Sequence, residues 1–393
     1  MELKIETIEM LLLIAAVVAM LARRLRIPYS IGLVVAGIAL ALLPFSPAIQ
    51  LTKQLLFTTL LPPLIFEAAF QIRWADLKKD LRLVLLLATV GVAISAAATA
   101  TGIHYAVSWP WISAVVFGLL IAATDPVAVI ATFKEAKIHG RIRLLVEAES
   151  LFNDGTAAAA FALALAFAAG ESTSTFGIAK TFGFVVFGSI ICGAVVAGLV
   201  LLLSGAAQDH LVELTFSTVA AYGSFLLAEH FHGSGVLATL TAGLLIGNVG
   251  HLAISSTGRK AVLEFWEYAA FVANSLIFLL IGLQLAHRDY RSALLAAAAG
   301  VVIVIFARAL AVYPLALLFA RTRQRVTWWH QHILFWGGLR GALALALALG
   351  IPETMPNRQE IITVAFGVVA FSIIVQGLTI IPLLRRAVPQ GES

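Results

Sequence analysis

Residues 111–132 read WISAVVFGLLIAATDPVAVIAT, an apolar stretch with one acid and one proline in its interior. A membrane helix needs roughly 20 mostly apolar residues, so the stretch is long enough to span a bilayer. Proline removes a backbone N–H and pushes the preceding residue away from α geometry, so we expect the helix to unwind at Asp125-Pro126. Unwound backbone at that depth is tolerated where it lines a cavity or is buried in protein. A simple proline kink, with Asp125 capping a half-helix, is the alternative.

The rest of the chain has the same apolar character. Of its 393 residues, 61% are apolar and 12% are charged, whereas soluble domains are about half apolar and a quarter charged. The single cysteine, Cys192, excludes a disulfide framework and a cysteine-based metal site. The net charge of +5 fits the positive-inside bias of a membrane protein, so no nucleic-acid partner is expected. The composition predicts an all-α polytopic membrane protein without a cofactor.

Charged and Pro/Gly-rich breaks divide the chain into about thirteen apolar segments. With the N-terminus outside, 18 Lys and Arg residues fall in cytoplasmic loops and 6 on the outer side, which predicts N-outside and C-inside in the cell membrane. We expect one transmembrane domain over 1–386 and a short cytoplasmic tail over 387–393. The segments are 7–22, 28–43, 53–72, 82–106, 111–132, 144–168, 176–204, 211–231, 234–250, 262–285, 292–320, 330–350 and 360–384.

A faint internal repeat relates the two halves. The tetrapeptide at 63–66, PLIF, resembles SLIF at 275–278, an offset of 212 residues. The same offset carries Asp125 to Gly337, where Gly337-Gly338-Leu339-Arg340-Gly341 interrupts another apolar segment. Paired interruptions in two halves are typical of transporters built from inverted repeats. We therefore expect six-helix repeats at about 7–168 and 211–386, joined by a linker helix at about 176–204.

Ionisable residues inside the spans are costly and therefore functional candidates. The four acids outnumber the two bases, and buried carboxylates without partners must be protonated or hold a cation. On a helix, Glu149 and Asp154 point about 140° apart, so we expect one to pair with an arginine and the other to face a cavity. The alternative is two structural carboxylates that are each paired with an arginine. The six residues are Glu67, Asp125, Glu149, Asp154, Arg308 and Arg340.

Three motifs now carry a family resemblance. Thr124-Asp125-Pro126, Glu149-Ser150-x-x-Asn153-Asp154 and the glycine-rich 337–342 together resemble the NhaP-type sodium/proton antiporters, relatives of the animal sodium/proton exchangers. The segments 61–67 and 306–308 are also similar to family segments, and the resemblance covers almost the whole chain in order. It implies two inverted six-helix repeats with two unwound, crossing helices, in a homodimer surrounded by membrane lipid.

The resemblance also implies roles for particular residues. Asp154 matches the essential aspartate that binds the ion or the proton, and Asn153 matches the asparagine that steadies the unwound segment. Glu149 and Arg308 match a structural ion pair, while Arg340 matches a structural or coupling arginine beside the second unwound helix. The other groups implied around Na⁺ are Ser150, Thr124, Asp125 and Glu67.

The function implied is exchange of Na⁺ for H⁺ across the cell membrane, in pH homeostasis, with Li⁺ as a further substrate. Asparagine at 153, where some relatives carry a second aspartate, favours electroneutral exchange. A K⁺/H⁺ antiporter of the same family is the alternative, because the same oxygen ligands serve K⁺. A channel filter and a nucleophile–base pair are not evident in the sequence, which argues against a channel or an intramembrane enzyme. Three further acids near segment ends, Glu147, Glu213 and Glu264, are expected to be solvated.

Overall fold

The computed structural model describes residues 5–25, 27–43, 51–125, 129–130, 133, 140–170, 175–205, 209–290 and 293–387, and over these ranges it contains helices and no strands. Each predicted segment contains at least one helix, so the predicted all-α fold is confirmed. In chain order the helices are α1 (Ile5–Leu25), α2 (Tyr29–Ala41), η1 (Leu55–Leu60), α3 (Leu61–Gln71), α4 (Trp74–Leu86), η2 (Leu87–Gly91), α5 (Val92–Val107), α6 (Trp111–Ala122), α8 (Arg141–Ala168), α9 (Thr175–Ser204), α10 (His210–His230), α11 (Gly235–Val249), η3 (Gly250–Leu252), α12 (Ser256–His287), α13 (Leu294–Leu318), α14 (Trp328–Trp336), α15 (Ala342–Leu349), α16 (Arg358–Phe371), η4 (Ser372–Gln376) and α17 (Gly377–Ala387).

Within these ranges, eight helices are long and apolar enough to cross a membrane, and three shorter apolar helices accompany them. Two helices begin earlier than the hydropathy predicts: α4 starts at Trp74 and α12 at Ser256. Helical hydrogen bonding continues past the apolar segment because water can solvate the charged side chains of these first turns, such as Lys79. Hydropathy therefore places the spans but not the ends of the helices.

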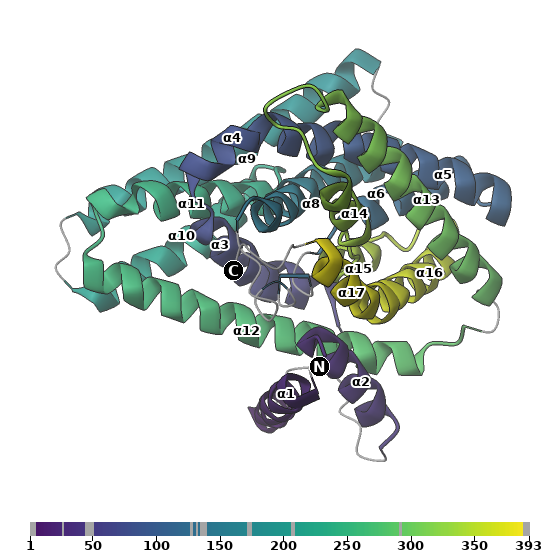
Figure 1. Ribbon diagram of the computed structural model, residues 1–393, viewed down its shortest axis with the longest axis horizontal. Coiled ribbons are helices and arrows are strands. Elements are labelled where there is room, and N and C mark those ends of the chain that lie inside the picture. Colours follow the sequence, from purple (N-terminus) through teal and green to yellow (C-terminus); the bar gives the residue numbers. More distant parts are fainter. Residues whose placement is uncertain are drawn as a thin grey trace.

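One group of helices consists of α1–α3 and α9–α12. In Figure 1, α12 runs along one edge of the molecule with α1 and α2 beside it, while α9, α10 and α11 gather at one end. Helix α2 packs on α12 where Gly37 and Gly282 meet, and a Cβ atom on either glycine would overlap the backbone of the other helix. Helix α11 packs on α3 in the same way, with Gly247 against Phe70. The predicted repeat relates α2 to α11 and α3 to α12, so it exchanges these two pairs of helices. The exact boundaries of the repeat stay a prediction.

The second group consists of α4–α6, α8 and α13–α17. Helix α6 packs between α5 and α8, and α13 packs on α5, α14 and α16. This group contains both predicted breaks: α6 ends at Ala122, and five residues separate α14 from α15. The backbone N–H of Asp125 donates to the carbonyl of Leu339 at 2.7 Å, so the two breaks meet inside the second group.

Candidate ion-binding site

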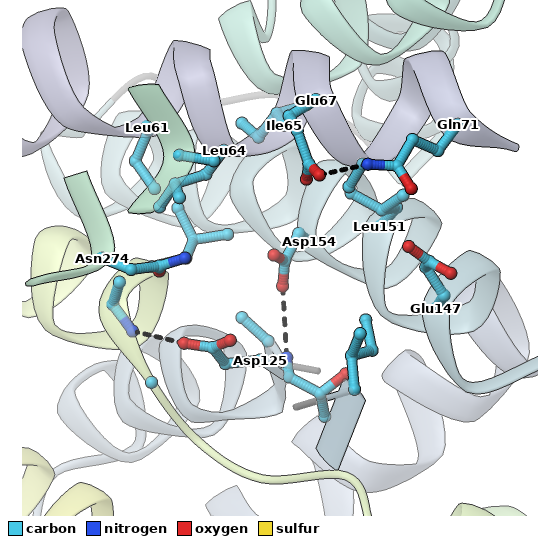
Figure 2. A pocket seen from close by; sticks show the side chains of 18 of the residues that line it. Leu61, Leu64, Ile65, Glu67, Gln71, Asp125, Glu147, Leu151, Asp154 and Asn274 are labelled. Atoms are coloured by element: carbon cyan, nitrogen blue, oxygen red, sulfur yellow. Dashed lines mark hydrogen bonds between the residues drawn. The ribbon is translucent and has the colours of Figure 1, made fainter. Parts of the chain in front are cut away.

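A cavity of about 290 Å³ lies between the two groups of helices. Its walls come from α2, α3 and α12 on one side and from α8 and both breaks on the other. Figure 2 shows Asp154 near the middle of this cavity, with the side chain of Glu67 on the opposite wall. Asp125 and Thr124 also line the cavity, so four of the predicted ion-binding residues face the same space.

The first break presents its backbone to Asp154. Ala123 leaves helical geometry with ψ of 138°, and the N–H of Thr124 then donates to Oδ1 of Asp154 at 3.2 Å. The hydroxyl of Thr124 lies 2.7 Å from that of Ser150, and both residues are buried. Pro126, predicted to cause the break, lies outside the described residues. The unwound segment therefore brings the backbone N–H of Thr124 to the Asp154 carboxylate and its hydroxyl to Ser150 of α8, which does not itself line the cavity.

Asp125 caps the helix that follows the second break. Its carboxylate accepts a hydrogen bond from the N–H of Ala342, the first residue of α15, at 3.3 Å. A carboxylate at a helix N-terminus stabilises the exposed N–H groups and the positive end of the helix dipole. Gly341 lies directly against this carboxylate and leaves no room for a Cβ atom. Asp125 thus caps a half-helix, as in the alternative prediction from the sequence. The half-helix that it caps, however, follows the second break and not the first.

Arg340 binds the C-terminal end of α6. Its side chain is buried, and Nη1 donates to the carbonyls of Ala122 at 2.8 Å and Ala123 at 3.2 Å. These are the carbonyls at the C-terminal end of α6, where the helix dipole is negative. The backbone N–H of Arg340 donates to Oγ of Ser372 at 2.9 Å. The guanidinium therefore replaces the missing helical partners of the first break.

Glu149 and Arg308 form the predicted pair. Nη1 and Nη2 of Arg308 donate to the two carboxylate oxygens of Glu149 at 2.8 and 2.9 Å, and both side chains are buried. Nη2 also donates to the carbonyl of Leu334 in α14 at 2.9 Å. The guanidinium fits because Gly338 has no side chain: a Cβ atom there would lie 2.6 Å from Nε. One arginine thus joins α8, α13 and α14.

Asn153 lies between this pair and the first break. Its Nδ2 donates to Glu149 Oε1 at 3.3 Å and to Thr124 Oγ1 at 3.4 Å. It does not line the cavity. This geometry fits the steadying role that the family resemblance implies for Asn153, and it places the side chain outside the cavity lining.

The acids are spread around the cavity rather than gathered at one point. Glu67 accepts a hydrogen bond from Nε2 of Gln71, one turn further along α3 (Figure 2). Among the described residues, no three His, Cys, Asp or Glu side chains are close enough to hold a metal ion together. A cation beside Asp154 would therefore take most of its ligands from hydroxyl and backbone oxygens of the first break.

Sequence reasoning missed three residues that line the cavity and one buried acid elsewhere, Glu213. Glu147 and Glu213 were expected to be solvated, but their exposed fractions are 9% and 1%. Glu213 accepts from the N–H and hydroxyl of Ser255 before α12, and Glu147 lines the cavity. Tyr29 of α2 and Asn274 of α12 also line it, from the wall opposite Asp154. No motif marks these residues, because the packing of distant helices buries Glu213 and brings the other three to the cavity.

The comparisons with known proteins agree with this architecture. The protein-family model described as "Sodium/hydrogen exchanger, transmembrane" matches residues 11–386. The Na⁺/H⁺ antiporter ApNhaP of Aphanothece halophytica is 38% identical over 368 residues, covering 92% of this chain and 70% of that protein. The low-affinity Na⁺/H⁺ antiporter NhaS1 of Synechocystis is 37% identical, covering 90% of this chain and 68% of that protein.

A solved structure shares the fold. The sodium proton antiporter MjNhaP1 from Methanocaldococcus jannaschii at pH 8 aligns with a TM-score of 0.75 at 20% identity, over 98% of both chains. An electron-microscopy structure of the same antiporter aligns with a TM-score of 0.79 over 100% of this chain and 99% of that one. The family match extends over nearly the whole chain and includes both breaks. This chain therefore belongs to the sodium/hydrogen exchanger family of membrane transporters.

Proposed function

We propose that this protein exchanges Na⁺ for H⁺ across the cell membrane, with Asp154 binding either ion in turn. The observation that carries the proposal is the contrast between two acids on α8. Glu149 is held by both nitrogens of Arg308 and lies away from the cavity. Asp154 lines the cavity, and among the described residues it forms no ion pair with Lys, Arg or His.

A buried carboxylate without a cation favours its protonated form, because burial disfavours the charged state. Na⁺ is a hard cation that prefers several oxygen ligands. Asp154 and Thr124 supply such oxygens in the cavity, and the Ser150 hydroxyl lies directly behind Thr124, 2.7 Å from its hydroxyl, with Asp125 and Glu67 on the surrounding walls. Proton and Na⁺ then compete for Asp154, and exclusive occupancy on each side of the membrane gives exchange. The conformational change would move the second group of helices against the first.

The exchange we propose is electroneutral. Asn153 donates to its neighbours and carries no charge, so we assign Asp154 alone as the group that binds Na⁺ and H⁺ in turn. One Na⁺ then replaces one proton, and no net charge crosses the membrane. The transport rate would be independent of membrane potential. The family resemblance further supports a homodimer in the cell membrane, and the distribution of Lys and Arg over the loops supports an N-terminus outside and a C-terminus in the cytoplasm.

The test is cation-dependent proton flux in proteoliposomes, for the wild type and Asp154→Asn, with Na⁺, Li⁺ and K⁺ in turn. We expect flux with Na⁺ and Li⁺ that is lost in the variant. The matched control is Glu264→Gln, because Glu264 is exposed and lies outside the cavity. Flux with K⁺ alone would identify a K⁺/H⁺ antiporter instead. Full Na⁺ flux in Asp154→Asn would overturn the assignment of this carboxylate.

A further inference from the structure

A second, wider cavity adjoins the ion-binding cavity. It measures about 700 Å³ and lies between the end of α3, the start of α4 and the start of α8. Three residues, Gln71, Arg143 and Glu147, line both cavities. We call the wider cavity the outer cavity, because Asp154 does not line it, and the first one the inner cavity; Arg73 and Lys79 in the outer cavity are among the basic residues expected on the cytoplasmic side. We call the three shared residues the neck, because an ion that travels from the outer cavity to Asp154 passes them. Figure 2 shows Gln71 and Glu147 together on one side of Asp154.

The charge changes across the neck. In the outer cavity, Asp76 pairs with Lys79 at 2.8 Å and with Arg73 at 3.6 Å, and Asp80 pairs with Arg141 at 2.7 Å. The described lining of the inner cavity instead contains five acids and one base, Arg143. The five acids are Glu67, Asp125, Glu147, Asp154 and Glu267. The outer cavity, with four bases and three acids, is nearly balanced in charge, so a cation enters acidic surroundings where Arg143 lies beside Glu147.

The Arg143–Glu147 pair contributes little to the stability of α8. The residues are four apart on α8, with Nε 3.8 Å from Oε2, which is longer than a hydrogen bond. The basic residue comes first, which is the less favourable order for a helical ion pair. Arg143 also lies near the start of α8, at the positive end of the helix dipole, where a cation is disfavoured. Local helix stability therefore does not account for this arrangement.

We propose that Glu147 is a steering residue for the transported cation and that Arg143 limits access to it. A cation that arrives from the outer cavity takes the place of Arg143 beside Glu147 and then moves inward to Asp154. Glu147 is not a ligand in the final ion complex, because that complex forms at the first break. The inference rests on the proposed function, since it concerns the route by which the exchanged cation arrives.

The experiment compares the wild type, Glu147→Gln and Arg143→Gln in everted and right-side-out membrane vesicles. When Na⁺ is added on the face of the outer cavity, we expect Glu147→Gln to raise the KM for Na⁺ about threefold to tenfold, within the range of electrostatic steering. Arg143→Gln should lower this KM, and higher ionic strength should reduce the difference. The maximal rate should stay within about twofold of wild type, and KM measured from the opposite face should not change.

Glu264→Gln is the matched control. Glu264 and Lys260 are also four apart on one helix with an N···O distance of 3.8 Å, but both side chains are exposed. Glu147→Asp, which keeps the charge, should retain the wild-type KM and tests the proposal if Glu147→Gln folds poorly. An unchanged KM in both neck variants, or an equal change from both faces, would overturn the proposal. Absence of Na⁺ exchange by the wild type in the same vesicles would instead contradict the proposed function.

Discussion

The N–H of Asp125 donates to the carbonyl of Leu339 at 2.7 Å, and this bond joins the break after α6 to the break between α14 and α15. The carboxylate of the same Asp125 then caps α15. The two broken helices are therefore held as one unit beside Asp154, and a disturbance of either break should reach the ion site.

Gly341→Ala tests this coupling. The new Cβ atom would overlap the Asp125 carboxylate, so Asp125 must move and α15 loses its cap. We expect the Na⁺-dependent proton flux in proteoliposomes to fall at least about tenfold, because the loss of a cap and a shifted ligand together cost more than about 1.4 kcal/mol. Gly198→Ala is the control, since open space surrounds a Cβ atom at Gly198 in α9. Equal flux in the two variants would contradict the coupling.

Arg308→Ala should destabilise the protein strongly. It leaves Glu149 buried without its guanidinium partner, and breaking a buried pair from one side costs about 3–5 kcal/mol. Thermal unfolding in detergent should show a lower Tm, together with a reduced yield of monodisperse protein. The double variant Glu149→Gln with Arg308→Gln should recover part of this loss, because no unpaired charge is then buried. A double variant that is less stable than Arg308→Ala would show that the pair acts through something other than charge.

Thr124→Val and Ser150→Ala should weaken Na⁺ binding. Each removes one of two hydroxyls that lie 2.7 Å apart beside Asp154, and a hydrogen-bonding group of this kind is worth about 0.5–1.5 kcal/mol. We expect the KM for Na⁺ to rise up to about tenfold, whereas Thr124→Ser should behave as wild type. The control is Thr156→Val: Thr156 lies on the same helix as Ser150, but its hydroxyl donates to the carbonyl of Phe152 and not to a group of the first break. A KM that does not change in either variant would remove these hydroxyls from the site.

Asp80→Asn should loosen the outer-cavity end of the second group. Nε and Nη2 of Arg141 donate to the Asp80 carboxylate at 2.9 and 2.7 Å, and the same guanidinium binds the carbonyls of Gln324 and Arg325. We expect a loss of about 2 kcal/mol in the free energy of unfolding, since the pair is mostly buried. Trypsin should also cleave faster after the arginines between α13 and α14.

Asp76→Asn is the control for the contact of Asp80 with Arg141. Asp76 pairs with Lys79 on the same surface, but both side chains are exposed and screened by solvent, so the loss of stability should be smaller than for Asp80→Asn. Equal protease sensitivity of the Asp76 and Asp80 variants would show that Arg141 does not hold the α13–α14 connection.

Hydropathy and local chemistry were enough to predict the helices and the breaks. Asp125-Pro126 and the run from Gly337 to Gly341 interrupt apolar segments, and the helices end at Ala122 and Trp336 as expected. The prediction for Glu147 and Glu213 was wrong, because both lie near helix ends where water is expected to reach. Their burial comes from neighbouring helices that cover them, which no pattern within α8 or α10 reveals.

The sequence by itself determined that this is an all-helical membrane protein with two broken spans and a small set of charged residues inside them. Those properties depend on the residue types along one segment, because the cost of placing a side chain or an open backbone in lipid is local. The family resemblance implied the Glu149–Arg308 pair, but no local pattern gives it, and only the tertiary structure decided the partners of Arg340 and Asp125. Arg308 reached Glu149, 159 positions away, while Arg340 reached the carbonyl of Ala122, 218 positions away. The physical reason is that pairing energy depends on distances between helices, and packing sets those distances.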